Sequence, residues 1–151
     1  MIYAAEFCYD EKNVPIWPAM AVNYTSKTQF LFRINKGVLD VTEHTRLNEY
    51  TPEDRRRVPF RNMIYIGDGF TDVPCMKLVT VNGGHSIAVY QEDIKTANAM
   101  IKQGRVNFTA YADYSKGSKI EKIVFAVLEK IKSTDAIINM HIADEEVAKE
   151  E

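Results

Sequence analysis

The sequence has few of the residues that build disulfide frameworks and metal clusters. It contains two cysteines, Cys8 and Cys75, and neither has the close partner that a metal pair or a redox motif requires. Its three histidines are scattered along the chain without ligand spacing. We therefore expect reduced thiols, as in the cytoplasm, and assign no chemistry to the histidines.

Long apolar runs and an excess of one charge sign are lacking too. The longest apolar runs, such as residues 123–128, are far shorter than the roughly 20 residues that span a bilayer, so we expect no membrane partner. The first ten residues lack the basic region and apolar stretch of a secretory signal. The formal net charge of −2 gives no electrostatic reason to expect nucleic acid.

The second half of the chain alternates short apolar strands with helical patterns. We expect strands at residues 63–66, 86–90 and 107–111, followed in turn by helices at residues 71–81, 93–102 and 118–132. Such alternation predicts an α/β fold, with a parallel sheet and helices on both of its faces.

The first half predicts smaller elements. A strand at residues 1–7 enters a hairpin, and residues 14–22 contain two prolines, which indicates an edge strand or an extended connection. A helix is expected at residues 27–36, capped by a hydroxyl group of residues 24–26 and ended by Gly37. Residues 39–61 are polar and read as a surface connection.

The chain divides into a core domain and a tail on this interpretation. Residues 1–133 hold all the predicted strands and helices. Residues 134–151 end in an acidic stretch that starts at Asp144, and terminal stretches of this kind commonly fray. We therefore expect an acidic carboxy-terminal tail.

Two aspartates follow the strand at residues 63–66. Asp68 comes at its carboxyl end, where open α/β sheets place their ligands, and Asp72 falls in the first turn of the next helix. Gly67 and Gly69 let the backbone turn and approach a ligand closely. The two carboxylates could converge on one Mg²⁺. Alternatively, Asp68 satisfies loop amides and Asp72 complements the helix dipole.

Lys27 starts a predicted helix, where the positive end of the helix dipole disfavours a cation. A locally unfavourable charge hints at function, although an exposed lysine is the common alternative. Lys36 is a weaker candidate, because the dipole already explains a lysine at a helix carboxyl end.

These segments resemble motifs of haloacid-dehalogenase-type (HAD) phosphatases. Gly67-Asp68-Gly69-x-x-Asp72 after an apolar strand resembles their fourth motif, and residues 27–31 resemble their third. The resemblance implies that Asp68 ligates Mg²⁺ and that Asp72 supports the metal shell or positions the lysine. It implies that Lys27 neutralises the phosphoryl group and the nucleophilic carboxylate.

Two further segments, residues 83–89 and 112–118, are similar to a phosphoserine-phosphatase-like branch of that family. The resemblance covers about residues 1–131 and implies a partial Rossmann-like (HAD-like) sheet. The family's reaction begins at an Asp-x-Asp motif, and this sequence contains none. The second motif, a Ser or Thr that binds the phosphoryl group, is missing as well. We therefore expect a carboxy-terminal part of a phosphohydrolase that is inactive alone.

Two alternatives stay open: a catalytically dead module that binds phosphate or metal, and a split enzyme whose nucleophile arrives on another chain. In the family, the strands of motifs one and two lie between those that resemble residues 1–7 and 63–66. Their absence exposes strand edges, which recruit other strands. Either residues 1–7 close onto 63–66, or a second copy or the missing amino-terminal half fills the gap. Of these, we expect a homodimer. A phosphorylated small molecule is the expected ligand.

Overall fold

The computed structural model describes residues 2–150, which form a mixed α/β fold around a three-stranded parallel sheet. Strands β3 (Ile64–Gly67), β4 (His85–Tyr90) and β5 (Phe108–Tyr111) lie in the order β3-β4-β5. Ile64 pairs with His85, which fixes the register of β3 on β4. All three strands that the apolar pattern predicts are confirmed to within a residue or two.

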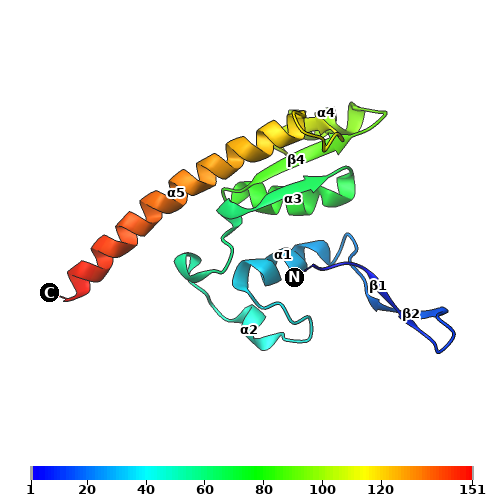
Figure 1. The fold of residues 1–151 in the computed structure, drawn as a ribbon, viewed down its shortest axis with the longest axis horizontal. Helices are drawn as coiled ribbons and strands as arrows, with labels where there is room; N and C mark the ends of the chain where they lie inside the picture. The colour runs from blue at the N-terminus through cyan, green and yellow to red at the C-terminus, as the bar shows by residue number, and fades with distance from the viewer. Residues whose placement is uncertain (1, 151) are drawn as a thin grey trace.

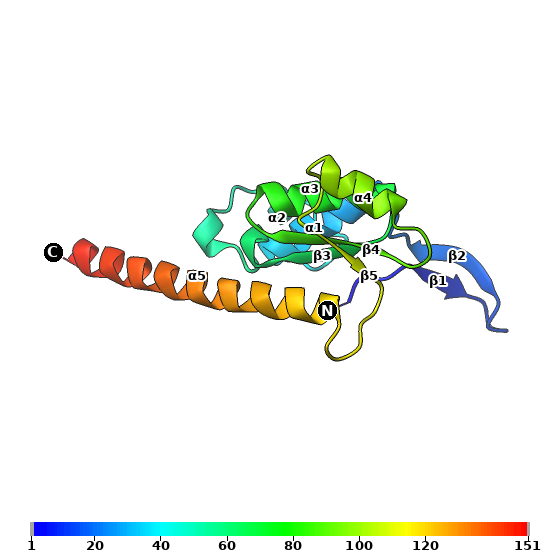
Figure 2. The same ribbon diagram turned by 90° about the horizontal axis from the view of Figure 1, so that it is seen from above.

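Helices cover both faces of this sheet (Figure 2). Helices α3 (Val73–Val81) and α4 (Lys95–Lys102) lie on one face, and α5 (Lys119–Glu150) lies on the other. Side chains alternate along β4, so that Ala88 packs with α3 and α4 while Ile87 packs with α5. Because β4 is buried on both faces, it is apolar throughout its centre.

Helix α1 (Lys27–Lys36) packs against α3 and ends as predicted (Figure 1). Gly37 adopts a left-handed conformation with φ of 74° and donates its N–H to the last turn. The predicted hydroxyl cap is wrong, because Ser26 makes no side-chain capping bond. Instead, the Asn23 carboxamide oxygen accepts hydrogen bonds from the amides of Thr25 and Ser26 and shapes the entry to the helix.

Residues 39–61 connect α1 to the sheet and contain the short elements α2 (Thr45–Asn48), η1 (Glu53–Arg55) and η2 (Phe60–Asn62). The buried Arg33 of α1 holds the first part of this connection through hydrogen bonds to three backbone carbonyl groups. The predicted surface connection is therefore confirmed for its course, but it is anchored to the core at Arg33 and at the buried Phe60.

Strands β1 (Glu6–Tyr9) and β2 (Pro15–Met20) form the predicted hairpin, closed by a turn in which Asn13 has φ of 61°. The first strand begins at Glu6 and ends at Tyr9, so the predicted bounds of residues 1–7 are too early. Met1 lies outside the described residues. The hairpin is a separate two-stranded sheet that stands away from the body (Figures 1 and 2). The predicted pairing of residues 1–7 with residues 63–66 is therefore wrong. The local turn pairs β1 with β2, and pairing with β3 would require the hairpin to relocate. Within the described chain, one edge of β3 is unpaired.

Helix α5 is much longer than predicted and runs through the expected tail to Glu150. The prediction of a frayed tail from Asp144 is wrong. Residues 133–150 contain no glycine or proline, and residues 143–150 are mostly alanine, glutamate and lysine, which favour the helix. Contacts from Glu145 to His141 and Lys149, four residues away on either side, add support. The proposed division at residue 133 thus falls inside a helix. None of the helices in residues 2–150 is long and apolar enough to cross a membrane.

Candidate functional site

The carboxyl end of β3 brings Asp72 back against the strand. Residues Phe70–Asp72 form the short helix η3, which turns the chain into α3. A Cβ atom on Gly67 would lie 2.6 Å from the Cγ atom of Asp72, so only glycine allows this close approach. Gly69 is extended, and a Cβ there would come no nearer than 3.8 Å to another residue. The fold therefore requires glycine at Gly67, because of Asp72, and its own contacts do not require it at Gly69; the close approach of a ligand at both glycines stays a prediction.

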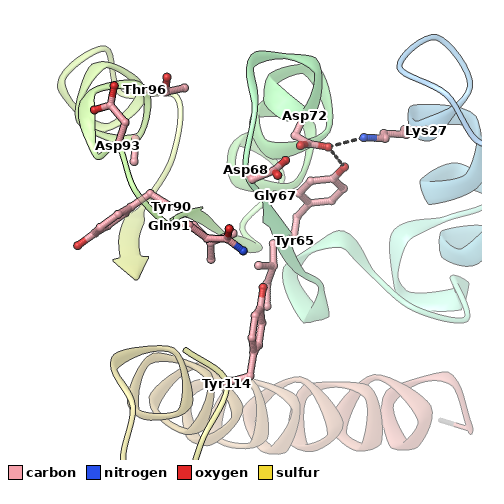
Figure 3. A pocket seen from close by; sticks show the side chains of 13 residues that line it. Lys27, Tyr65, Gly67, Asp68, Asp72, Tyr90, Gln91, Asp93, Thr96 and Tyr114 are labelled. Carbon is pink, nitrogen blue, oxygen red and sulfur yellow. Dashed lines mark hydrogen bonds and ion pairs between the residues drawn. The ribbon is translucent and has the colours of Figure 1, made fainter. Parts of the chain in front are cut away.

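Asp72 holds Lys27, although 45 residues separate them in the sequence (Figure 3). The Lys27 ammonium donates to Asp72 Oδ1 at 2.6 Å, and the Tyr65 hydroxyl donates to the same oxygen at 2.7 Å. The backbone amide of Gly69 approaches Asp72 Oδ2 at 3.4 Å. Of the two roles that the resemblance implies for Asp72, this geometry fits the positioning of the lysine.

Burial and hydrogen bonding set the protonation of this cluster. Burial alone would raise the pKa of Asp72, but the hydrogen bonds from Lys27 and Tyr65 outweigh it, and the net pKa is lowered. The pKa of Tyr65 is raised, mainly by burial and to a smaller extent by the hydrogen bond to Asp72. Tyr65 therefore remains a donor, and Asp72 remains an ionised acceptor, at neutral pH.

A pocket of about 590 Å³ opens beside this cluster, at the carboxyl ends of β3 and β4. Lys27, Asp68 and Asp72 all line it, so the structure brings the three predicted side chains to one cavity. Lys36 lies elsewhere, because its ammonium donates to the carbonyl groups of Leu47 and Glu49 and anchors the connection after α1.

The pocket also has polar walls that the sequence interpretation missed. They are provided by Tyr65, Tyr90, Gln91, Asp93, Thr96 and Tyr114. Gln91 directly follows β4 and Asp93 comes two residues later, so the rule that singled out Asp68 would also have found them. The sequence does not point to Tyr65 as a site residue, because tyrosine is common in strands.

The donor set fits Mg²⁺ only in part. In residues 2–150, no three His, Cys, Asp or Glu side chains gather as a metal site. Both carboxylate oxygens of Asp72 already accept hydrogen bonds, whereas Asp68 is exposed and lines the pocket. Mg²⁺ commonly uses one or two carboxylates and completes its shell with water and phosphate oxygens. Asp68 is therefore the residue that would hold the ion.

Comparison with known proteins identifies a relative without a stated activity. A protein of Borreliella burgdorferi, described as an uncharacterized protein, is 36% identical over 114 residues. The match covers 70% of this chain and 38% of the relative, so the chain spans about two fifths of that protein's length. No protein family model and no solved structure matches the chain. The functional assignment therefore depends on the geometry of the site.

Proposed function

We propose that this chain binds a phosphomonoester group together with Mg²⁺ in the pocket of Lys27 and Asp68, as the carboxy-terminal part of a HAD-type phosphohydrolase. The observation that carries the proposal is the Lys27 ammonium, held 2.6 Å from Asp72 Oδ1 beside Asp68 at the end of β3. Both segments that resemble the family's motifs thus meet in one pocket. A partial Rossmann-like sheet is the fold that this proposal assigns to β3, β4 and β5.

The charges of the pocket favour joint binding of cation and phosphate. One lysine and three aspartates, Lys27, Asp68, Asp72 and Asp93, line it. The Lys27–Asp72 pair is neutral overall, so Asp68 and Asp93 leave an excess of negative charge that repels a phosphate dianion. A divalent cation at Asp68 offsets this excess and offers the phosphate oxygens a ligand site. Phosphate binding should therefore depend on Mg²⁺.

In this proposal, the chain by itself does not hydrolyse the bound phosphomonoester. Covalent phosphoryl transfer in the resembled family needs a nucleophilic aspartate from an Asp-x-Asp motif, which this sequence lacks. Lys27 supplies positive charge and hydrogen-bond donors, and Mg²⁺ would supply electrostatic stabilisation. Neither replaces the nucleophile. A catalytically dead module that binds phosphate for regulation would use the same contacts.

The open edge of β3 favours a second candidate, one part of a split phosphatase. This edge is unpaired in the described chain, and it lies next to the proposed phosphate pocket. A strand from another polypeptide or from a second copy of this chain would complete the sheet there. A neighbouring reading frame that encodes an Asp-x-Asp strand would favour the split enzyme over the dead module.

Titration of the chain with inorganic phosphate, followed by NMR with and without Mg²⁺, tests the proposal. We expect shift changes around Lys27 and Asp68 only when both ligands are present. Lys27→Met and Asp68→Asn should abolish them, whereas Lys95→Met and Glu92→Gln, matched changes outside the pocket, should not. Binding of phosphate that is equally strong without Mg²⁺, or that survives Asp68→Asn, would contradict the assignment.

A hydrolysis assay tests the other half of the proposal. With Mg²⁺ present, the isolated chain should not cleave p-nitrophenyl phosphate above background. Turnover that persists through further purification and disappears in Asp68→Asn would show that the chain contains a nucleophile of its own.

A further inference from the structure

Helix α5 carries an apolar stripe on the face that points away from the sheet. Its inner face packs on the sheet through Ile120, and both Ile120 and Val127 are 4% exposed. On the outer face, Phe125 is 59% exposed and Val147 is 63% exposed. A stripe of this kind on a helix whose other face is already packed indicates a second packing partner.

The outer stripe is straight and symmetric about Ala136. Phe125 and Val147 lie eleven residues to either side of Ala136, and eleven residues make about three helical turns, so the three side chains share one line along the helix. Met140 and Ala143 continue it, because the spacing from residue 136 through 140 and 143 to 147 is four, three and four. This spacing is typical of helices that pair along their length.

The distal part of α5 has little support from its own chain. It projects beyond the body in both views (Figures 1 and 2). Asp135, which contacts Asn62 and Arg61, is the last residue of α5 with a polar contact to the rest of the described chain. Beyond it, Ile137 and Met140 are 67% and 68% exposed. An isolated helix of about 15 residues is marginal in water, so this segment needs a partner to be stable.

Charge identifies the orientation of that partner. Residues 119–132 contain four lysines and two glutamates, whereas residues 133–150 contain five acidic residues and one lysine. A second α5 in parallel orientation would place like charges side by side. In antiparallel orientation, the basic half of each helix lies beside the acidic half of the other, which favours pairing.

We propose that a second copy of this chain covers the outer stripe, with the two α5 helices antiparallel and crossing at Ala136. Phe125 of each copy then packs beside Val147 of the other, and Glu146 lies within one turn of Lys122. The small side chain of Ala136 allows close approach at the two-fold axis. Because the stripe faces away from the sheet, the two bodies lie on opposite sides of the helix pair and do not collide.

Sedimentation velocity on the full chain tests the assembly. We expect a dimer with twice the 17.3 kDa chain mass at micromolar concentration. The double variant Met140→Glu with Val147→Glu should weaken the dimer more than about tenfold, because it places charges in the apolar seam. Val81→Glu, an equally exposed valine on α3, should leave it unchanged. A monomer at all concentrations, or a dimer that the double variant does not affect, overturns the proposal; the latter result would place the contact outside the outer stripe of α5.

Charge reversal and cross-linking test the orientation with changes that leave the fold intact. Lys122→Glu and Glu146→Lys should each weaken the dimer, and their combination should restore it. In a Cys8→Ser background, Ala136→Cys should form an intermolecular disulfide on oxidation, whereas Val147→Cys should not. Cross-linking at residue 147 as well as at 136 would indicate a parallel pair in register and overturn the antiparallel arrangement.

Discussion

Removing the Tyr65 hydroxyl should weaken the Lys27–Asp72 cluster measurably. In Tyr65→Phe, the ring stays in place, but Asp72 Oδ1 loses the donor that now lies 2.7 Å away. A hydrogen bond to a charged group contributes about 1.5–3 kcal/mol, and the partial burial of Tyr65 places this one near the lower value. For a chain of this length, 1.5 kcal/mol corresponds to a fall in Tm of about 3–6 °C.

The loss should depend on pH in a defined direction. The folded pKa of Asp72 is lowered, so its ionisation stabilises the fold above the unfolded pKa of about 3.9, and this contribution disappears as pH falls through the folded pKa. Tyr65→Phe removes one cause of the lowering and should raise the pKa of Asp72. The difference in free energy of unfolding between parent and variant should therefore be largest near pH 7 and shrink below pH 4.

Urea unfolding at several pH values measures this difference, and ¹³C NMR of the Asp72 carboxyl group measures its titration. Tyr111→Phe is the matched control, because Tyr111 also lies in a strand but is 56% exposed. Its stability should stay within about 0.5 kcal/mol of the parent. If Tyr65→Phe is as stable as the parent, or if its loss is the same at pH 7 and pH 3, the hydroxyl does not stabilise the Asp72 carboxylate.

Three further changes have outcomes that the structure specifies. Gly67→Ala should cost about 1–3 kcal/mol in urea unfolding, because the added methyl group overlaps Asp72, whereas Gly69→Ala should be much milder; equal effects would contradict the close-approach argument. Arg33→Met should lower the free energy of unfolding by about 3 kcal/mol and increase amide exchange after α1, since it leaves three carbonyl groups without their donor. Burial lowers the pKa of His85, so as pH drops below about 6.5 the unfolded chain takes up a proton before the folded chain does, and the free energy of unfolding should fall. His85→Gln should remove this dependence of stability on pH. An unchanged dependence in the variant would show that it does not come from His85.

The sheet was predictable because its signals are local and consistent. In β4, apolar residues fill successive positions, and both faces of the strand are buried. Gly37 could be identified as a helix end because a left-handed residue there favours glycine. Asp68 could be singled out because open α/β sheets place their ligands at the carboxyl ends of strands, and the structure places Asp68 on the pocket there.

The features that sequence alone did not predict depend on long-range contacts or on competing propensities. Arg33 reads as a surface residue of a short helix, and only the folded connection shows that the residue is 1% exposed. Tyr65 matters through Asp72, seven residues away across a turn whose geometry is set by Gly67. The acidic end of α5 suggested a tail, but strong helix propensity outweighed the charge.

In the proposed function, the Lys27–Asp72 pair would let the site serve both a phosphate and a carboxylate. A lysine ammonium has three N–H donors, and Asp72 takes one of them in the described chain. The Lys27 side chain is 28% exposed and lines the pocket, so its remaining donors are available there. In the proposed function, phosphate takes them when Mg²⁺ offsets the charge of Asp68 and Asp93. If a strand with a nucleophilic aspartate docks at the edge of β3, the same donors neutralise that carboxylate, and Asp72 keeps the lysine in place for both partners.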